Sequence, residues 1–253
     1  MNILITNDDG IFTEGIRILA ETLAEKHNVC VVAPDSDCSG TSHSLTVLKR
    51  LSYEKYNYIK GVKAYSLKGT PSDCVKFATK VLLEKNPDLV ISGINNMPNL
   101  GTDIIYSGTV NAALEGAICG IKSVALSVLY ENTGDYEYVS RFMLGNLERI
   151  CALLTVDTVF NINFPSGKPE LLKGIRFSEL GVQSYSDAYV MQTRGDENHY
   201  FLTGDIIKTP ENEENCDVEL HDKMYVTVTP LHIQMTDFDA LHRLNKADSG
   251  LKL

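Results

Sequence analysis

Two adjacent carboxylates mark the first place in the chain where chemistry could occur. Asp8 and Asp9, followed by Gly10, come directly after a short apolar run. Neighbouring carboxylates repel each other unless positive charge lies between them, and a hard divalent cation satisfies both through oxygen ligands. No Cys/His cluster accompanies them, so Mg²⁺ or Mn²⁺ is favoured over zinc. A plain tight turn is the alternative interpretation, because Asp and Gly are common turn residues.

Two further segments are rich in side-chain oxygen. "CSGTSHS" contains Ser39 and His43, and "SGINNMPNLG" contains Asn95 and Asn99. Hydroxyl and amide oxygens are neutral ligands for a hard cation, and amide N–H groups donate to phosphate. The alternatives are a solvated hydroxyl-rich loop and a chain of Asx turns. A Ser–His hydrolase is poorly supported because the chain has no GxSxG elbow.

A fourth segment, "YSGTV", has the features of an anion site. Ser107 is placed as the N-cap of a helix, and Gly108 and Thr109 then present backbone N–H groups at its positive end. Ordinary capping is the alternative and needs only Ser107. A cation loop and an anion-binding helix start on neighbouring strands together predict a site for phosphate.

The elements that must position these residues alternate regularly along the first 165 residues. Apolar β-branched runs predict buried strands, and 3.6-residue periodicity predicts helices between them. The expected strands are 2–5, 29–34, 88–92, 123–128 and 158–164, and the expected helices are 14–26, one capped by Thr70, one starting at Ser107, and 136–154. This order predicts an α/β fold with a doubly wound, Rossmann-like three-layer core. In such a sheet, ligands bind beyond the carboxyl ends of the strands, where all four segments lie.

The character of the chain changes after Pro165. Interspersed aromatic, β-branched and polar residues over 175–208 predict β-hairpins, followed by a strand at 224–231 and a short helix at 237–244. We therefore expect a catalytic core over residues 1–165. Residues 166–253 are expected to form a hairpin-rich extension that completes the fold.

Composition excludes several classes of protein. The 253 residues carry a net charge of −10, which disfavours binding of a polynucleotide. No apolar run is long enough for a membrane span, and no secretion signal is visible, so a cytoplasmic protein is expected. The six scattered cysteines form no CxxC pair, which favours reduced thiols. GxGxxG and GxxxxGK[ST] motifs are absent, which disfavours NAD binding and excludes a P-loop.

The order and spacing of four motifs resemble the SurE family of survival-protein nucleotidases. They are "NDDG", "SGTSHSLT", "GTPSDCV" and "SGIN…PN.G.D..YSGTV.AA.EG", and they cover residues 2 to about 128. The resemblance implies a metal-dependent phosphomonoesterase acting on nucleoside 5′-monophosphates. Whether 3′-monophosphates and short polyphosphates are also cleaved is left open by the sequence. The resemblance implies metal ligands at Asp8, Asp9, Ser39 and Asn95. It also implies homodimers or homotetramers formed through the C-terminal hairpins.

The resemblance also gives roles at the phosphate, and it leaves two departures. Phosphate contacts are expected at Asn99 and at the segment 107–109. The nucleophile is either water, which we favour, or Asp8, and His43 is a candidate acid/base or a hydrogen-bonding residue. Met97 stands where the family usually has glycine, and Cys38 where a basic or polar residue is frequent. Both departures bear on substrate preference.

Two other functions compete with this interpretation. A haloacid-dehalogenase phosphatase needs DxDx[TV] after the first strand, and the adjacent acids do not have that spacing. A non-catalytic module that senses nucleotide or phosphate would use the same pocket. Binding without turnover would distinguish the sensor from the enzyme.

Overall fold

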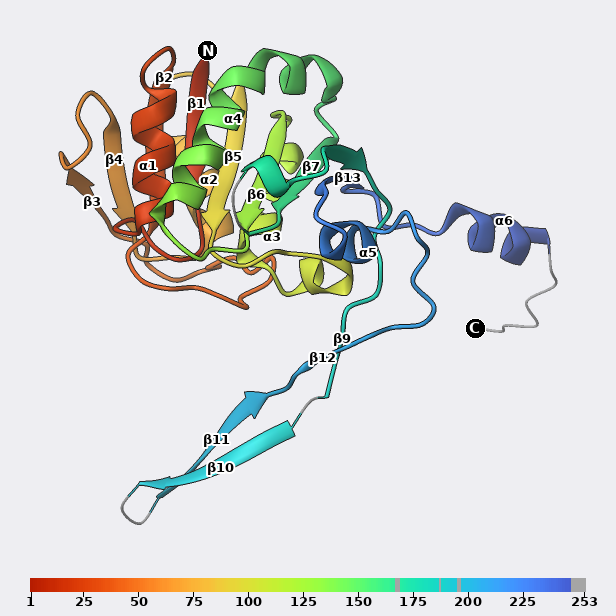
Figure 1. Cartoon of the computed structure of the whole chain (residues 1–253). Helices are drawn as coiled ribbons and strands as arrows, with labels where there is room; N and C mark the ends of the chain where they lie inside the picture. Colours follow the sequence, from red (N-terminus) through yellow and green to blue (C-terminus); the bar gives the residue numbers. More distant parts are fainter. Residues whose placement is uncertain (167–168, 187, 195–196, 247–253) are drawn as a thin grey trace.

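The computed structural model describes residues 1–166, 169–186, 188–194 and 197–246. A nine-stranded sheet forms the middle layer of a three-layer α/β fold, with helices on both faces (Figure 1). Its core is six parallel strands in the order β4-β2-β1-β5-β6-β7. Their bounds are β1 Asn2–Thr6, β2 Asn28–Pro34, β4 Lys63–Leu67, β5 Leu89–Asn95, β6 Ser123–Val128 and β7 Thr158–Phe164. The predicted doubly wound core is confirmed.

Alternate residues of the strands pack on opposite faces of the sheet. Ile3 and Ile5 belong to the larger apolar core, which includes α1 and α4, whereas Leu4 belongs to the core formed with α2 and α3. The helices are α1 Glu14–Leu23, α2 Pro71–Phe77, α3 Gly108–Ile118 and α4 Thr133–Leu153. Strands covered on both faces read as continuous apolar runs, which is why the sequence identified them.

The helix boundaries differ from the expected ones in three places. The first helix ends at Leu23, three residues earlier than expected. The helix capped by Thr70 continues as a π-helical turn, η1, over Ala78–Leu82. The long helix starts at Thr133, because Asn132 and Asp135 form a capping box there.

Three strands at the margins complete the sheet. β3 Tyr53–Tyr56 pairs antiparallel with β4, and neither strand was predicted. The exposed "YEKY" of β3 has no apolar alternation that would indicate a strand. On the other side, β13 Val226–His232 pairs antiparallel with β7, and β8 Ile175–Phe177 pairs with β13. Part of the C-terminal third thus extends the central sheet.

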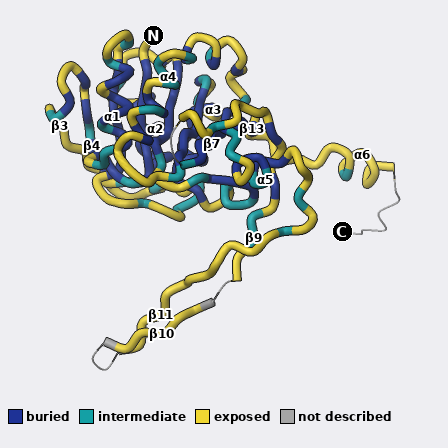
Figure 2. Tube along the Cα trace, in the orientation of Figure 1, coloured by how far each residue is buried: buried dark blue, intermediate teal, exposed yellow. Residues whose placement is uncertain are grey.

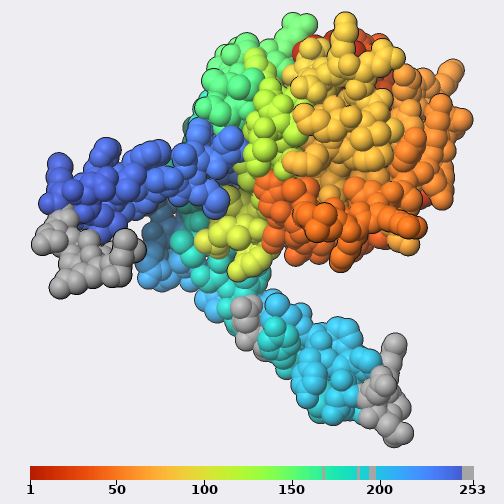
Figure 3. Space-filling view, turned by 180° about the vertical axis from the view of Figure 1, so that it is seen from behind, coloured from red at the N-terminus to blue at the C-terminus, as the bar shows by residue number. Residues whose placement is uncertain are grey.

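Two further parts of the C-terminal third project from the body as arms, whereas α5 packs on the body beside β13 (Figures 1 and 3). The first arm contains the predicted hairpins, β10 paired with β11 and β9 paired with β12, and Figure 2 shows it exposed almost throughout. The second arm carries α6. The bounds are β9 Ser184–Tyr185, β10 Ala188–Arg194, β11 Glu197–Thr203, β12 Ile206–Ile207, α5 Asp217–Asp222 and α6 Phe238–Lys246, with short 3₁₀ turns η2 Gly101–Ile105 and η3 Pro169–Leu171. Within the described ranges no helix has the length and apolarity to cross a membrane.

The strand order reverses at β1. The chain runs from β1 outward to β2 and β4, and then returns to place β5 on the other side of β1. Such a switch point leaves a crevice beyond the carboxyl ends of the strands. The loops after β1, β2 and β5 meet there, and they carry the carboxylates, hydroxyls and amides singled out from the sequence.

Candidate functional site

A cavity of about 300 Å³ lies at this edge of the sheet, between the loops after β1, β2 and β5. It brings together five of the predicted site residues. Its lining residues are Asp8, Ser39, Gly40, Asn95, Asn96, Met97, Asn99, Asp103, Tyr106 and Ser107. Asp9, His43, Gly108 and Thr109 are not among them.

Asp8 lies buried against the start of α3. Its carboxylate accepts a hydrogen bond from the hydroxyl of Thr109. Burial raises the pKa of Asp8, while the Thr109 hydroxyl and backbone N–H act to lower it. Gly108 makes the approach of the helix feasible: a Cβ added there would lie 2.7 Å from the Cβ of Asp8. Because Gly108 has no side chain, the first turn of α3 can pack directly against the side chain of Asp8.

Asp9 is only partly buried, and it lies near two other carboxylates, those of Asp8 and Asp37. Burial, followed by the negative charges of Asp8 and Asp37, raises the pKa of Asp9 to about 7. Asp37 was not singled out from the sequence. Its carboxylate accepts hydrogen bonds from the backbone N–H and hydroxyl of Ser39, at 2.8 and 2.6 Å. The site is therefore strongly acidic, and a bound cation would relieve the repulsion.

Local hydrogen bonds orient the two neutral candidate ligands. The Ser39 hydroxyl donates to Asp37, which directs its proton away from the cavity and leaves its oxygen as an acceptor. The Asn95 amide donates through Nδ2 to the carbonyl of Met97 at 2.7 Å. Because the nitrogen of Asn95 is held within its own loop, its Oδ1 is the group left for a ligand.

The donors at this site fit a hard divalent cation. Asp8, Ser39 and Asn95 line one cavity, with Asp9 adjacent to Asp8, and all four present oxygen. The described residues contain no group of three or more His, Cys, Asp or Glu side chains able to hold a metal. A metal here would thus depend on the hydroxyl and amide oxygens as well as on the two carboxylates, which suits Mg²⁺ or Mn²⁺.

The N-terminus of α3 has the predicted cap. The Ser107 side chain accepts a hydrogen bond from the Val110 N–H at 3.1 Å. Gly108 and Thr109 form the first turn, and the anion that they face in this structure is Asp8. The positive end of the helix dipole therefore points at the carboxylate that borders the cavity.

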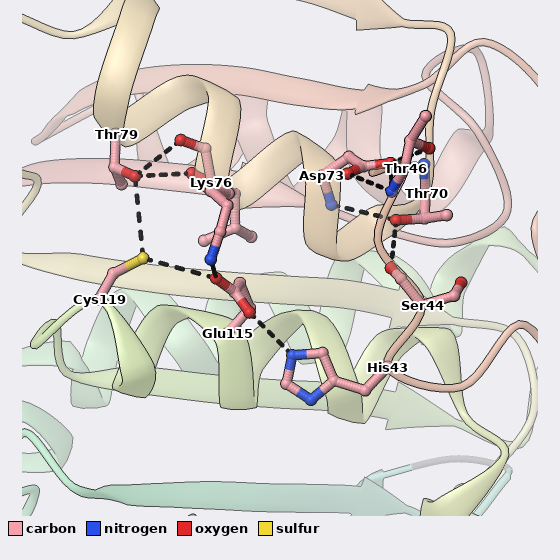
Figure 4. A network of polar contacts seen from close by, with 10 residues as sticks. His43, Ser44, Thr46, Thr70, Asp73, Lys76, Thr79, Glu115 and Cys119 are labelled. Atoms are coloured by element: carbon pink, nitrogen blue, oxygen red, sulfur yellow. Dashed lines mark hydrogen bonds and ion pairs between the residues drawn. The ribbon is translucent and has the colours of Figure 1, made fainter. Parts of the chain in front are cut away.

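The ring of His43 points toward Glu115 of α3 (Figure 4). Its Nε2 lies 2.9 Å from Oε2 of Glu115, a residue of α3 that the sequence did not single out. Lys76 of α2 lies 2.5 Å from the other oxygen of Glu115. Burial raises the pKa of Glu115, but hydrogen bonds from His43 and Lys76 outweigh burial and leave the pKa below its ordinary value. The loop that carries Ser39 is thereby tied to two helices.

The two departures from the family pattern lie in different surroundings. Met97 lines the cavity with 55% of its surface exposed, and Tyr106 lines it with 63% exposed. They are the large apolar and aromatic side chains in an otherwise polar lining. Cys38 instead has its Sγ 3.8 Å from the Gly69 carbonyl, and its backbone N–H donates to the Asp8 carbonyl at 2.8 Å. Of the two departures, Met97 is therefore the one that borders the cavity.

Comparisons with known proteins match this chain to SurE proteins, and the relatives align with nearly its whole length. The family model "Survival protein SurE" matches residues 3–187. The "5'-nucleotidase SurE" of Pseudothermotoga lettingae is 39% identical over 99% of this chain and 96% of its own. The protein of that name from Synechococcus elongatus is 40% identical over 97% and 98%. The crystal structure of the SurE protein from Aquifex aeolicus gives a TM-score of 0.82 at 35% identity, covering 97% of this chain and 99% of that one. Because these matches each cover well over half of the chain, the protein belongs to the SurE family.

Proposed function

We propose that this protein is a metal-dependent 5′-nucleotidase, which hydrolyses nucleoside 5′-monophosphates to nucleoside and phosphate. The observation that carries the proposal is the convergence, around one cavity, of Asp8, two neutral oxygen ligands and the N-terminus of α3. Both relatives are named 5′-nucleotidase SurE, and this chain matches almost their full lengths. No observation favours a sensor without turnover.

The divalent cation, Mg²⁺ or Mn²⁺, would be held by Asp8, Asp9, Ser39 and Asn95. When bound, it would neutralise negative charge on the phosphoryl oxygens and orient the phosphate. Thr109 donates its hydroxyl to the Asp8 carboxylate, which opposes the rise in the pKa of Asp8 that burial causes. Asp37 fixes the rotamer of Ser39 through the hydroxyl proton.

The phosphate itself would be bound by Asn99, Ser107, Gly108 and Thr109. Backbone N–H groups in the first turn of α3 and the Asn99 amide can donate to phosphoryl oxygens. Because these donors are fixed by the fold before substrate arrives, they stabilise charge as it redistributes in the transition state. We propose water as the nucleophile, since the Asp8 carboxylate already accepts from Thr109 and is less free to attack.

His43 in this proposal holds the loop after β2 and does not transfer a proton. Its Nε2 is occupied by Glu115, at 2.9 Å, and Glu115 is also paired with Lys76. Thr46, three residues further along the same loop, donates its hydroxyl to Asp73 at 2.6 Å. His43 is one of several anchors that keep Ser39 beside Asp8.

The projecting hairpin of β10 and β11 would join copies of the chain into a homodimer or homotetramer. Large apolar side chains stand exposed on it, and exposed apolar patches of this kind mark association surfaces. They include Tyr189, Met191, Tyr200, Phe201 and Leu202. Light scattering on the purified protein would give the oligomer mass. A monomer at micromolar concentration would contradict this part of the proposal.

Phosphate release from a panel of nucleoside 5′- and 3′-monophosphates, with Mg²⁺ or Mn²⁺, tests the proposed activity. We expect release from the 5′-monophosphates and identification of the matching nucleoside as the second product. Short polyphosphates in the same panel would define how far the specificity extends. Tight nucleotide binding without release would support the sensor instead.

A further inference from the structure

Two asparagines are buried in the middle of an apolar strand. Asn161 and Asn163 of β7 are both 0% exposed, and β7 lies between β6 and β13 in the central sheet. They alternate with Phe160, Ile162 and Phe164, which pack into the larger apolar core. The asparagines thus share the opposite face, the one that carries Val159 beside α3. A buried amide is costly unless it is hydrogen-bonded, so these two need partners.

Their partner is Asn99, a proposed phosphate ligand more than sixty residues away in the chain. The side chain of Asn163 accepts from the Asn99 N–H at 2.7 Å and donates to the Asn99 carbonyl at 3.1 Å. Asn161 donates to the same carbonyl at 2.8 Å. Both polar groups of the Asn99 backbone are therefore held by strand side chains.

The side chain of Asn99 is held as well. Its Nδ2 donates to the hydroxyl of Ser127, a buried residue of β6, at 2.9 Å. One amide proton is thus fixed in the protein, and the second proton and Oδ1 remain for other partners. Asn99 is nearly buried and lines the cavity together with Asp8 and Ser107.

We propose that Asn161, Asn163 and Ser127 are positioning residues that aim the Asn99 amide at the phosphoryl group of the substrate. This inference rests on the proposed nucleotidase function. A donor acts best on a phosphoryl group when its direction is set in advance. Apolar residues would satisfy packing at these positions of β7, but they could not hydrogen-bond the backbone N–H and carbonyl of Asn99.

The test uses Asn163→Ala and Ser127→Ala in the full-length protein, with inorganic phosphate as a competitive inhibitor. We expect Asn163→Ala to raise the Ki of phosphate and lower kcat/KM for a nucleoside monophosphate by about 10- to 100-fold. The milder Ser127→Ala should change both by about 3- to 10-fold. The Kd for Mn²⁺ should stay within about twofold, because Asn99 is not among the four proposed metal ligands.

The matched control is Thr227→Val. Thr227 is buried, pairs in register with Asn163 on β13, and its Oγ1 makes no hydrogen bond in the structure. This substitution removes a buried polar group one strand away without touching Asn99. Normal phosphate Ki and kcat/KM are expected.

A double-mutant comparison separates positioning from general support of the fold. If Asn163 acts through the Asn99 amide, Asn99→Ala/Asn163→Ala should be no worse than Asn99→Ala alone. Additive losses, an equal loss of Mn²⁺ affinity, a similar defect in Thr227→Val, or an unchanged phosphate Ki in Ser127→Ala would overturn the inference. Should Asn163→Ala fail to fold, Ser127→Ala decides. Failure of the proposed function itself would be seen differently, as no phosphate release by the unmodified protein.

Discussion

The hydroxyl of Thr109 donates a hydrogen bond to the carboxylate of Asp8 across a sequence separation of 101 residues. This bond joins the loop after β1 to the first turn of α3, the two segments expected to hold the metal and the phosphate. A phosphate bound at the start of α3 would therefore lie next to the candidate metal ligands. The arrangement places charge neutralisation and phosphate binding on the same face of the cavity.

Thr109→Val removes this donor while keeping the shape of the side chain. A hydrogen bond to a charged group is worth about 1.5–3 kcal/mol, so kcat/KM should fall about 10- to 100-fold. Thr109→Ser, which keeps the hydroxyl, should retain most of the activity. Steady-state kinetics of both variants check this, and a fully active Thr109→Val would show that the bond has no role in catalysis.

Gly108→Ala should be inactivating. The added methyl carbon would lie 2.7 Å from the Cβ of Asp8 and 2.9 Å from its Oδ2, so either α3 or the carboxylate must shift. We expect loss of kcat and weaker Mn²⁺ binding, measured by calorimetry. Gly145→Ala is the control, because its Cβ would meet nothing within 4 Å. It should stabilise α4 by about 0.5–1 kcal/mol without affecting turnover.

Asp9→Asn should stabilise the metal-free protein and abolish its activity. The folded-state pKa of Asp9 is raised from 3.8 to about 7, so the folded protein binds more protons than the unfolded chain between these values. Stability of the metal-free form therefore decreases as pH rises from about 4 to 7. The substitution should recover about 1–3 kcal/mol at pH 8. Thermal unfolding in EDTA at pH 5 and pH 8 measures this. An Asp9→Asn protein less stable than the parent at pH 8 would contradict a cost of ionising Asp9 through burial and the neighbouring acids.

Substitutions at His43 distinguish an anchor from a proton donor. His43→Gln can still hydrogen-bond Glu115, which His43→Ala cannot. If His43 is an anchor, the glutamine variant should keep kcat/KM within about fivefold of the parent, with the alanine variant lower. Loss of one limb of the pH–rate profile in both variants would instead support the acid/base role.

The core of the fold was predictable because its signals are local. Strands β1 and β5 each contain a short apolar run, at 3–5 and 89–91, and α2 has Thr70 and Pro71 at its start. The family resemblance is confirmed by the family model and the relatives. β3, β4 and α5 were missed: β3 is a short, exposed edge strand, β4 is only five residues long, and α5 has only six residues.

The shape of the site could be anticipated less well than its composition. Adjacent acids and amides indicated an oxygen-rich site, but the pairing of His43 with Glu115 and of Ser39 with Asp37 depends on packing between distant segments. One signal for the missed residues was present. The two asparagines of "NIN", at 161–163 within an apolar strand, indicate buried amides that need hydrogen-bond partners.

The most direct test of the central claim is release of phosphate from AMP by the parent protein and by Asp8→Asn. Each would be measured with Mn²⁺ and again after EDTA. We predict metal-dependent release by the parent, its disappearance with EDTA, and a loss of several orders of magnitude in Asp8→Asn with the fold intact. Release that persists in EDTA, or near-normal turnover by Asp8→Asn, would contradict a metal-dependent phosphomonoesterase centred on Asp8.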